Sequence, residues 1–223
     1  MNIPRITRIL GIDPGSRLTG YGCVDLVGNQ IRWVTHGTLK LASTSGRQEI
    51  PLEERLLLIH EGMTAVIREF KPEVMSIERV FFAKNAVSAL KLGQARGAAI
   101  LSGRIHSLSV FEYSPTEVKA AVVGHGRADK NQVAHMIQAL LGKQSFETSD
   151  ASDGLALAVC HALWLSSQLH RGASTRAAAG ASTGSLDSPA PRRGKRLSLA
   201  ESVGITAEMV ESGKRHLPLN AKK

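Results

Sequence analysis

The sequence predicts an α/β domain in which helices flank a five-stranded mixed sheet. Two observations favour this fold class. Strand-like and helix-like segments alternate through the first 170 residues of the 223-residue chain, as they do in layered α/β domains. The chain also opens with three consecutive strand-like segments. Because strands that follow one another closely pair antiparallel, we expect a meander beside the later, helix-connected strands.

The predicted strands are short segments rich in apolar residues: Thr7–Asp13, Gly20–Val27, Gln30–Leu41, Glu73–Glu78 and Ser109–Tyr113. The Gly28-Asn29 pair between the second and third segments is typical of a hairpin turn. The first three strands are therefore expected to form the meander.

The predicted helices lie between and after these strands: Leu52–Phe70, Asn85–Ser107, Pro115–Val123, Asp129–Leu141 and Ser149–Leu169. The first has the clearest pattern, because apolar residues recur every three or four positions behind Pro51 and the helix has to stop before Pro72. Helices of this kind can cover both faces of the sheet.

The composition changes near Arg171, and we expect a domain at residues 1–170 followed by a basic, low-complexity tail at 171–223. The tail has ten basic and four acidic residues, so it carries +6 of the chain's net charge of +9. Its Ala, Gly, Ser, Thr and Pro content offers too little apolar area to offset the entropy cost of ordering, which predicts disorder.

The positive charge, with a pI near 9.9, indicates a polyanionic partner such as a nucleic acid. A membrane is disfavoured, because no apolar stretch approaches the roughly 20 residues that a spanning helix needs. The short apolar run Ile9–Ile12 does not resemble a signal peptide. We therefore expect a soluble, cytoplasmic protein.

Two acidic residues end predicted strands. Asp13 follows an apolar run and precedes Pro14-Gly15, and Glu78 ends the fourth strand in the same way. If these strands are parallel neighbours, both carboxylates lie at the carboxyl edge of the sheet, where α/β proteins commonly place ligands. Each would be partly desolvated and would need a partner.

Asp150 and Asp153 lie three residues apart in the first turn of a predicted helix, so they share a face. Together with Asp13 and Glu78 they make four carboxylates that have no obvious basic partner and repel one another. Oxygen ligands in that number suit Mg²⁺, with Mn²⁺ as a substitute. Two such ions could clamp a phosphodiester for hydrolysis, so the pattern favours a nuclease.

Each acid also has a simpler interpretation. Asp13 before Pro-Gly could be a turn residue, Asp150 or Asp153 could be a helix-terminal charge, and Glu78 could pair with Arg79. Only the four acids together indicate a metal site.

Four motifs resemble the RuvC crossover junction endodeoxyribonucleases: Leu10–Gly22, Ile77–Asn85, Ala89–Gly97 and Asp150–Asp153. The resemblance runs from about residue 8 to residue 161. It implies a ribonuclease H-like fold and a homodimer that nicks opposite strands of a four-way (Holliday) DNA junction in recombination and DNA repair. It also implies the RuvA and RuvB branch-migration proteins as partners.

The same resemblance places the family's metal-binding acids on the four carboxylates above, its junction-contacting aromatic on Phe81, and its DNA-contacting lysines on Lys119 and Lys130. Phe81 and Phe82 could instead be core residues, and we expect Phe82 to be one. Other charges on helices, such as Arg96, are expected to be solvated. The Ala- and Gly-rich helix from Ala86 to Gly103 could serve as the dimer interface or pack closely on the sheet.

Two other classes are compatible with part of the pattern. The segment Asp13–Gly20 also resembles the phosphate loop of actin-like ATPases, which need a second domain for which this chain has no room. A module that binds junctions without cutting them would be expected to have lost one of the acids. No histidine has a spacing that requires a catalytic role, although His125, between two glycines, could approach DNA.

Overall fold

The computed structural model describes residues 5–41, 50–79, 85–142, 146 and 148–179, with the side chains of residues 169–179 left out. Five strands form one sheet in the order β3-β2-β1-β4-β5. Their bounds are β1 Ile6–Asp13, β2 Leu18–Val27, β3 Gln30–Lys40, β4 Val74–Glu78 and β5 Ser109–Tyr113. The predicted five-stranded sheet is confirmed, with β2 beginning two residues earlier than expected.

The sheet is mixed. Strands β1, β2 and β3 pair antiparallel as a meander, whereas β4 runs parallel to both β1 and β5. In the β1–β4 register Ile12 lies opposite Ile77, so the next residues of the two strands, Asp13 and Glu78, reach the same edge of the sheet. The parallel pairing on which the predicted site depends is therefore present.

Five helices complete the described fold: α1 Leu52–Phe70, α2 Ala86–Ile105, α3 Pro115–Val123, α4 Lys130–Leu141 and α5 Ser149–Ala179. Side-chain caps define where three of them begin. Asn85 accepts from two backbone N–H groups of α2, and capping boxes start α3 and α4, with Ser114 and Asp129 as the N-caps. These local signals explain why the predicted helix starts were close to the observed ones.

Helix α5 continues to residue 179, ten residues beyond its predicted end at Leu169. The segment after Arg171 lacks an apolar period but is rich in alanine, and alanine has the highest helix propensity. Helix formation there needs no buried face. The rest of the predicted tail, residues 180–223, lies outside the described residues.

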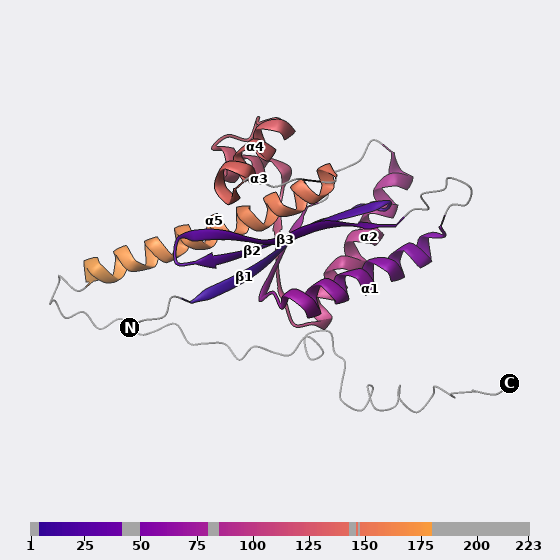
Figure 1. Cartoon of the computed structure of the whole chain (residues 1–223), viewed down its shortest axis with the longest axis horizontal. Coiled ribbons are helices and arrows are strands. Elements are labelled where there is room, and N and C mark those ends of the chain that lie inside the picture. Colours follow the sequence, from indigo (N-terminus) through magenta and orange to yellow (C-terminus); the bar gives the residue numbers. More distant parts are fainter. Residues whose placement is uncertain (1–4, 42–49, 80–84, 143–145, 147, 180–223) are drawn as a thin grey trace, which may run out of the picture. The chain divides into compact units, whose positions relative to one another are not determined.

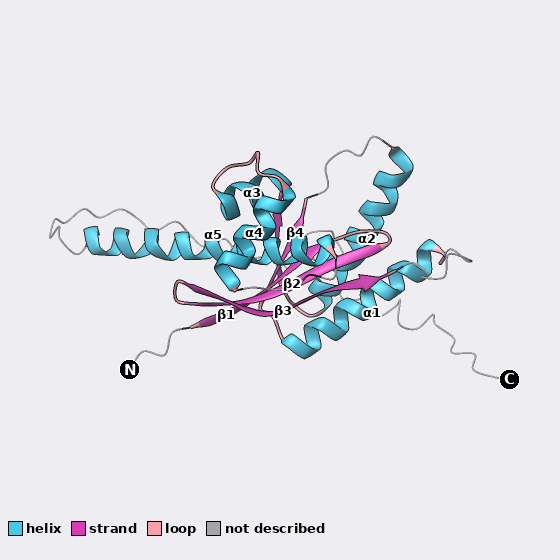
Figure 2. Ribbon diagram, turned by 45° about the horizontal axis from the view of Figure 1, so that its top comes forward, coloured by secondary structure: helices cyan, strands magenta, loops and turns pink. Residues whose placement is uncertain are grey.

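The helices form a layer on each face of the sheet (Figures 1 and 2). Helix α5 lies on one face, with α3 and α4 packed mainly against α5, in a core that includes Ile9 and Val24. Helices α1 and α2 cover the other in a core that includes Leu10 and Cys23. Neighbouring residues of one strand thus enter different cores, as the alternation of a strand requires.

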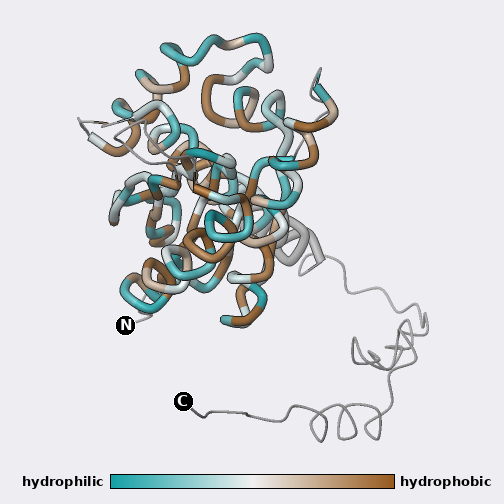
Figure 3. Tube along the Cα trace, turned by 90° about the vertical axis from the view of Figure 1, so that its right-hand side faces the viewer, coloured by the Kyte–Doolittle hydropathy of each residue, from teal (hydrophilic) through white to brown (hydrophobic). Residues whose placement is uncertain are grey.

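Hydrophobic and hydrophilic stretches alternate along the helices in Figure 3, as expected for elements with one buried face. Within the described residues, no helix combines the length and the apolar character that crossing a bilayer demands.

Candidate active site

Helix α5 lies directly on the backbone of β1 and β2 because glycines remove the side chains between them. A Cβ atom on Gly11 would collide with the backbone of Gly154, one on Gly20 with that of Asp150, and one on Gly22 with that of Leu155. This close approach brings the first turn of α5 to the end of β1, where Asp13 lies.

The carboxyl groups of Asp13 and Glu78 lie close together at the edge of the sheet. Burial, with the negative charges of Glu78, Asp153 and Asp150, raises the pKa of Asp13 to about 8. Burial also raises the pKa of Glu78. A cation between these carboxyl groups would offset both the desolvation and the repulsion.

The first turn of α5 supplies the other two acids. Thr148 fixes this turn, because its hydroxyl accepts from the backbone N–H of Ala151 at 3.3 Å and lies 2.6 Å from the hydroxyl of Thr38 on β3. Asp153 lines a cavity of about 310 Å³ together with Asp13 and Glu78. Asp150 does not line this cavity, although its charge acts on Asp13.

We call Asp13, Glu78, Asp150 and Asp153 the acid quartet. The structure thus brings residues from β1, β4 and α5 to one place, as the sequence predicted.

One expectation about the acid quartet is wrong: Asp153 has a basic partner. The Nζ atom of Lys130, the first residue of α4, lies 2.8 Å from Oδ2 of Asp153. This ion pair joins residues 23 apart in the chain, and only the packing of α4 beside α5 creates it. Pairing with Asp153 raises the pKa of Lys130.

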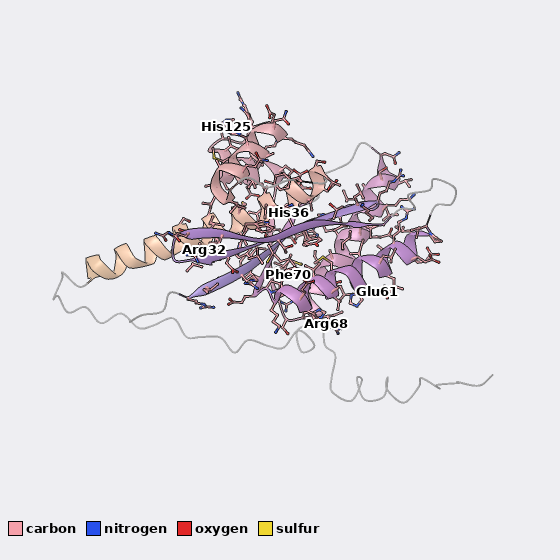
Figure 4. All side chains as sticks on the ribbon, in the orientation of Figure 1. Arg32, His36, Glu61, Arg68, Phe70 and His125 are labelled. Atoms are coloured by element: carbon pink, nitrogen blue, oxygen red, sulfur yellow. The ribbon has the colours of Figure 1, made fainter. Side chains whose placement is uncertain are left out.

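Lys119, on α3, lines the same cavity as Lys130, so both predicted DNA-contacting lysines lie beside the acids. Phe81 and Phe82 lie outside the described residues. His125 lies beside α3 and α4, whereas Glu61 and Arg68 lie on α1, beyond the opposite face of the sheet (Figure 4).

Other residues make the contacts that the simpler interpretations assign to Asp13 and Glu78. The turn after Asp13 is closed by Thr19, whose hydroxyl donates to the carbonyl oxygen of Gly15 at 3.0 Å. The guanidinium of Arg79 lies 3.7 Å from the carboxylate of Glu117 instead of pairing with Glu78. The Asp13 and Glu78 carboxyl groups are thus left to face each other.

Arg96 is a site residue that sequence reasoning missed. Its Nε donates to the backbone carbonyl oxygen of Glu78 at 3.0 Å, and its Nη2 lies 2.8 Å from Oε1 of Glu112. It stands in a motif shared with the family, but a single sequence gives no sign that this charge turns inward from α2.

The donor chemistry of the quartet fits a divalent cation. Its donors are all carboxylate oxygens, which suit Mg²⁺ or Mn²⁺, and a cation would offset the repulsion that helps to raise the pKa of Asp13. Among the described residues, no three acidic, histidine or cysteine side chains are already spaced to hold an ion. Ligation therefore requires small side-chain movements.

Comparison with known proteins places this site in a family context. The family model described as crossover junction endodeoxyribonuclease RuvC matches residues 9–161. A protein of that name from Shewanella piezotolerans is 54% identical over 153 residues, which cover 69% of this chain and 85% of the relative. One from Syntrophotalea carbinolica is 50% identical over 155 residues, covering 70% and 93%.

Two solved structures are also similar. T. thermophilus RuvC in complex with a Holliday junction substrate has a TM-score of 0.66 at 32% identity, covering 73% of this chain and 96% of that one. The yeast mitochondrial Holliday junction resolvase Ydc2 has a TM-score of 0.55 at 15% identity, covering 78% and 87%. The predicted ribonuclease H-like fold is confirmed.

Proposed function

Because the chain belongs to the RuvC family of crossover junction endodeoxyribonucleases, we propose that it resolves Holliday junctions by metal-dependent cuts in opposite strands at the acid quartet. The observation that carries this proposal is the meeting of Asp13 and Glu78 with the first turn of α5, beside two lysines. Family membership over the whole domain argues against an actin-like ATPase.

The four carboxylates of the quartet would hold the metal, with two Mg²⁺ ions, or Mn²⁺ in their place, as the proposed cofactor. When bound, the ions supply charge stabilisation to the attacking water and the leaving oxygen of the phosphodiester. Lys119 and Lys130, on the wall of the same cavity, would contact DNA phosphates. Phe81 would stack on an unpaired base at the junction centre.

The outer face of α2 supports a homodimer. Four apolar side chains on this face are more than half exposed: Val87 at 62%, Leu90 at 65%, Leu101 at 59% and Ile105 at 59%. Their spacing places them along one stripe of the helix. The small residues Ala95, Ala99 and Gly103 lie on the buried side, so they explain close packing on the domain core, and the larger residues form the proposed interface.

A dimer across the two α2 helices would carry two acid quartets, one for each of two opposed strands. Partnership with the RuvA and RuvB branch-migration proteins and a cytoplasmic location are part of the same proposal, which rests on family membership. The basic segment 171–223 would add non-specific attraction to phosphates.

The proposed reaction can be tested with a synthetic four-way junction. Wild-type protein should cut it in Mg²⁺ and leave it intact in chelator, and Asp150→Asn should cut at least about a hundredfold more slowly, because one metal ligand loses its charge. Glu61→Gln removes an exposed carboxylate from α1 and should cut as wild type does. Cutting that persists in chelator or in Asp150→Asn would contradict the proposal.

The same assay separates an enzyme from a module that only binds. Such a module would retain the junction in a gel-shift assay in both Mg²⁺ and chelator and would release no nicked product. A linear duplex of the same sequence serves as the substrate control.

A further inference from the structure

The ammonium group of Lys130 is a positively charged group at the exposed edge of the acidic site. Its Nζ lies 2.8 Å from Oδ2 of Asp153, and its side chain lines the cavity together with Asp13 and Glu78. The capping box of Asp129 and Gln132 fixes the start of α4, so Lys130 is held at the mouth of the site by the helix that carries it.

The contact with Asp153 conflicts with metal binding. The carboxylate that accepts from the lysine lies in the site where a cation would ligate, and a divalent ion bound to Asp153 would neutralise the negative charge that holds the ammonium group. Two positive charges that close also repel each other strongly. Lys130 and a metal ion therefore compete for the same carboxylate.

We propose that Lys130 and the metal exchange at Asp153: the lysine neutralises this acid in the free protein, and metal binding releases it to contact a DNA phosphate. This inference rests on the proposed metal site. The exchange would make binding of the metal ion and of the DNA junction cooperative. A cation that displaces Lys130 provides a free ammonium group for the junction, and a bound junction in turn draws the lysine away from Asp153.

Lys119 provides the matched comparison. It lines the same cavity from α3 and carries the same charge, yet within the residues that the structure describes it forms no ion pair with the quartet. Loss of either lysine removes one positive charge near the acids, but only the loss of Lys130 frees an Asp153 oxygen.

The first measurement is Mn²⁺ binding to the full-length, DNA-free protein by electron paramagnetic resonance. Lys130→Met should bind Mn²⁺ about two- to fivefold more tightly than wild type, the change that follows from removing an ion pair of modest strength. Lys119→Met should stay within about a factor of two of wild type, and Lys130→Arg, which keeps the charge, should not gain affinity.

The second measurement is junction affinity by gel shift, in chelator and in Ca²⁺. In chelator the lysine is held by Asp153, so Lys130→Met should lose little affinity, whereas in Ca²⁺ it should lose about tenfold, as expected for one phosphate contact. Lys119→Met should lose affinity in both conditions.

The proposed exchange is contradicted if Lys130→Met binds Mn²⁺ no more tightly than wild type, or if Lys119→Met gains as much Mn²⁺ affinity as Lys130→Met does. Asp153→Asn separates this failure from failure of the metal site itself. If Asp153→Asn weakens Mn²⁺ binding while Lys130→Met leaves it unchanged, the metal site stands and the exchange does not. If Asp153→Asn has no effect on Mn²⁺ binding, both proposals fail.

Discussion

Arg96 fixes the peptide of Glu78, because its Nε donates to the Glu78 carbonyl oxygen at 3.0 Å. The arginine side chain is only 18% exposed, and its second contact, to Glu112, ties the same guanidinium to β5. A residue on α2 thereby sets the position of an acid at the end of β4. Arg96 is a positioning residue, since it reaches the backbone of Glu78 and not its carboxylate.

We predict that Arg96→Met lowers the cleavage rate at saturating junction by about tenfold or more, because small displacements of a reacting group slow the reaction. The Mg²⁺ concentration needed for cleavage should rise. The Kd for the junction should change less than about twofold. Glu112→Gln, which leaves the bond to Glu78 in place, is the control. Equal losses of rate and junction affinity would show that Arg96 supports only the fold.

The close contact between α5 and the sheet predicts that Gly20→Ala damages the site. The added Cβ would collide with the backbone of Asp150, so α5 has to move away from β2. We expect a loss of about 1 to 3 kcal/mol in the free energy of unfolding, measured by denaturant titration, and slower cleavage.

Gly93→Ala is the matched control for this substitution, because nothing lies within 4 Å of the added Cβ and the residue is helical. It should leave stability unchanged or raise it slightly. If Gly20→Ala were as stable and active as wild type, the contact between α5 and β2 would not set the geometry of the site.

If the exposed apolar face of α2 forms the proposed homodimer, Leu90→Glu should disrupt it. Its side chain is 65% exposed in the single chain, and a charge placed there would be buried without a partner on association. Light scattering coupled to size exclusion should show a monomer, and on a junction the paired cuts should become single nicks. Leu140→Glu, at 42% exposure on α4, should remain dimeric.

The burial of His161 predicts how the free energy of unfolding depends on pH. The ring is fully buried, its Nδ1 lies 2.7 Å from the Tyr113 hydroxyl, and burial lowers its pKa to about 4. In the unfolded chain this pKa is about 6.5, so below that pH the unfolded state binds the additional proton. Stability should therefore fall as pH drops from about 6.5 to about 4 and then lose its dependence on this residue.

His161→Phe keeps a ring against Trp164 and removes the titration. Denaturant midpoints at pH 7 and pH 4.5 should differ less in this variant than in wild type, by an amount corresponding to roughly 2 to 3 kcal/mol. An unchanged difference would mean that the ring takes up its proton in the folded state without cost.

The strands, the helix starts and the acids were predictable because each depends on residues close together in the sequence. The apolar runs before Asp13 and Glu78 indicate strands, and Asn85 and Asp129 are local caps. The parallel pairing of β1 with β4 was an assumption that the register confirms.

Contacts across the fold could not be predicted in this way. The ion pair of Lys130 with Asp153 and the bond from Arg96 to Glu78 depend on how α4 and α2 pack, which no short pattern specifies. The small residues of α2 left two alternatives open for the same reason, since Ala95 and Ala99 could face either the core or a partner until the helix was placed.

The position of α5 in the chain has a consequence during protein synthesis. All five strands of the sheet have been synthesised once Tyr113 has been added. Helix α5 follows later, and it carries two acids of the quartet and covers most of one face of the sheet. A nascent chain that ends before Ser149 exposes the apolar residues of that face, Ile9 and Val24 among them, and so presents a surface for chaperones. It also carries only two of the four acids of the proposed metal site, so that site is complete only once the first turn of α5 has been made.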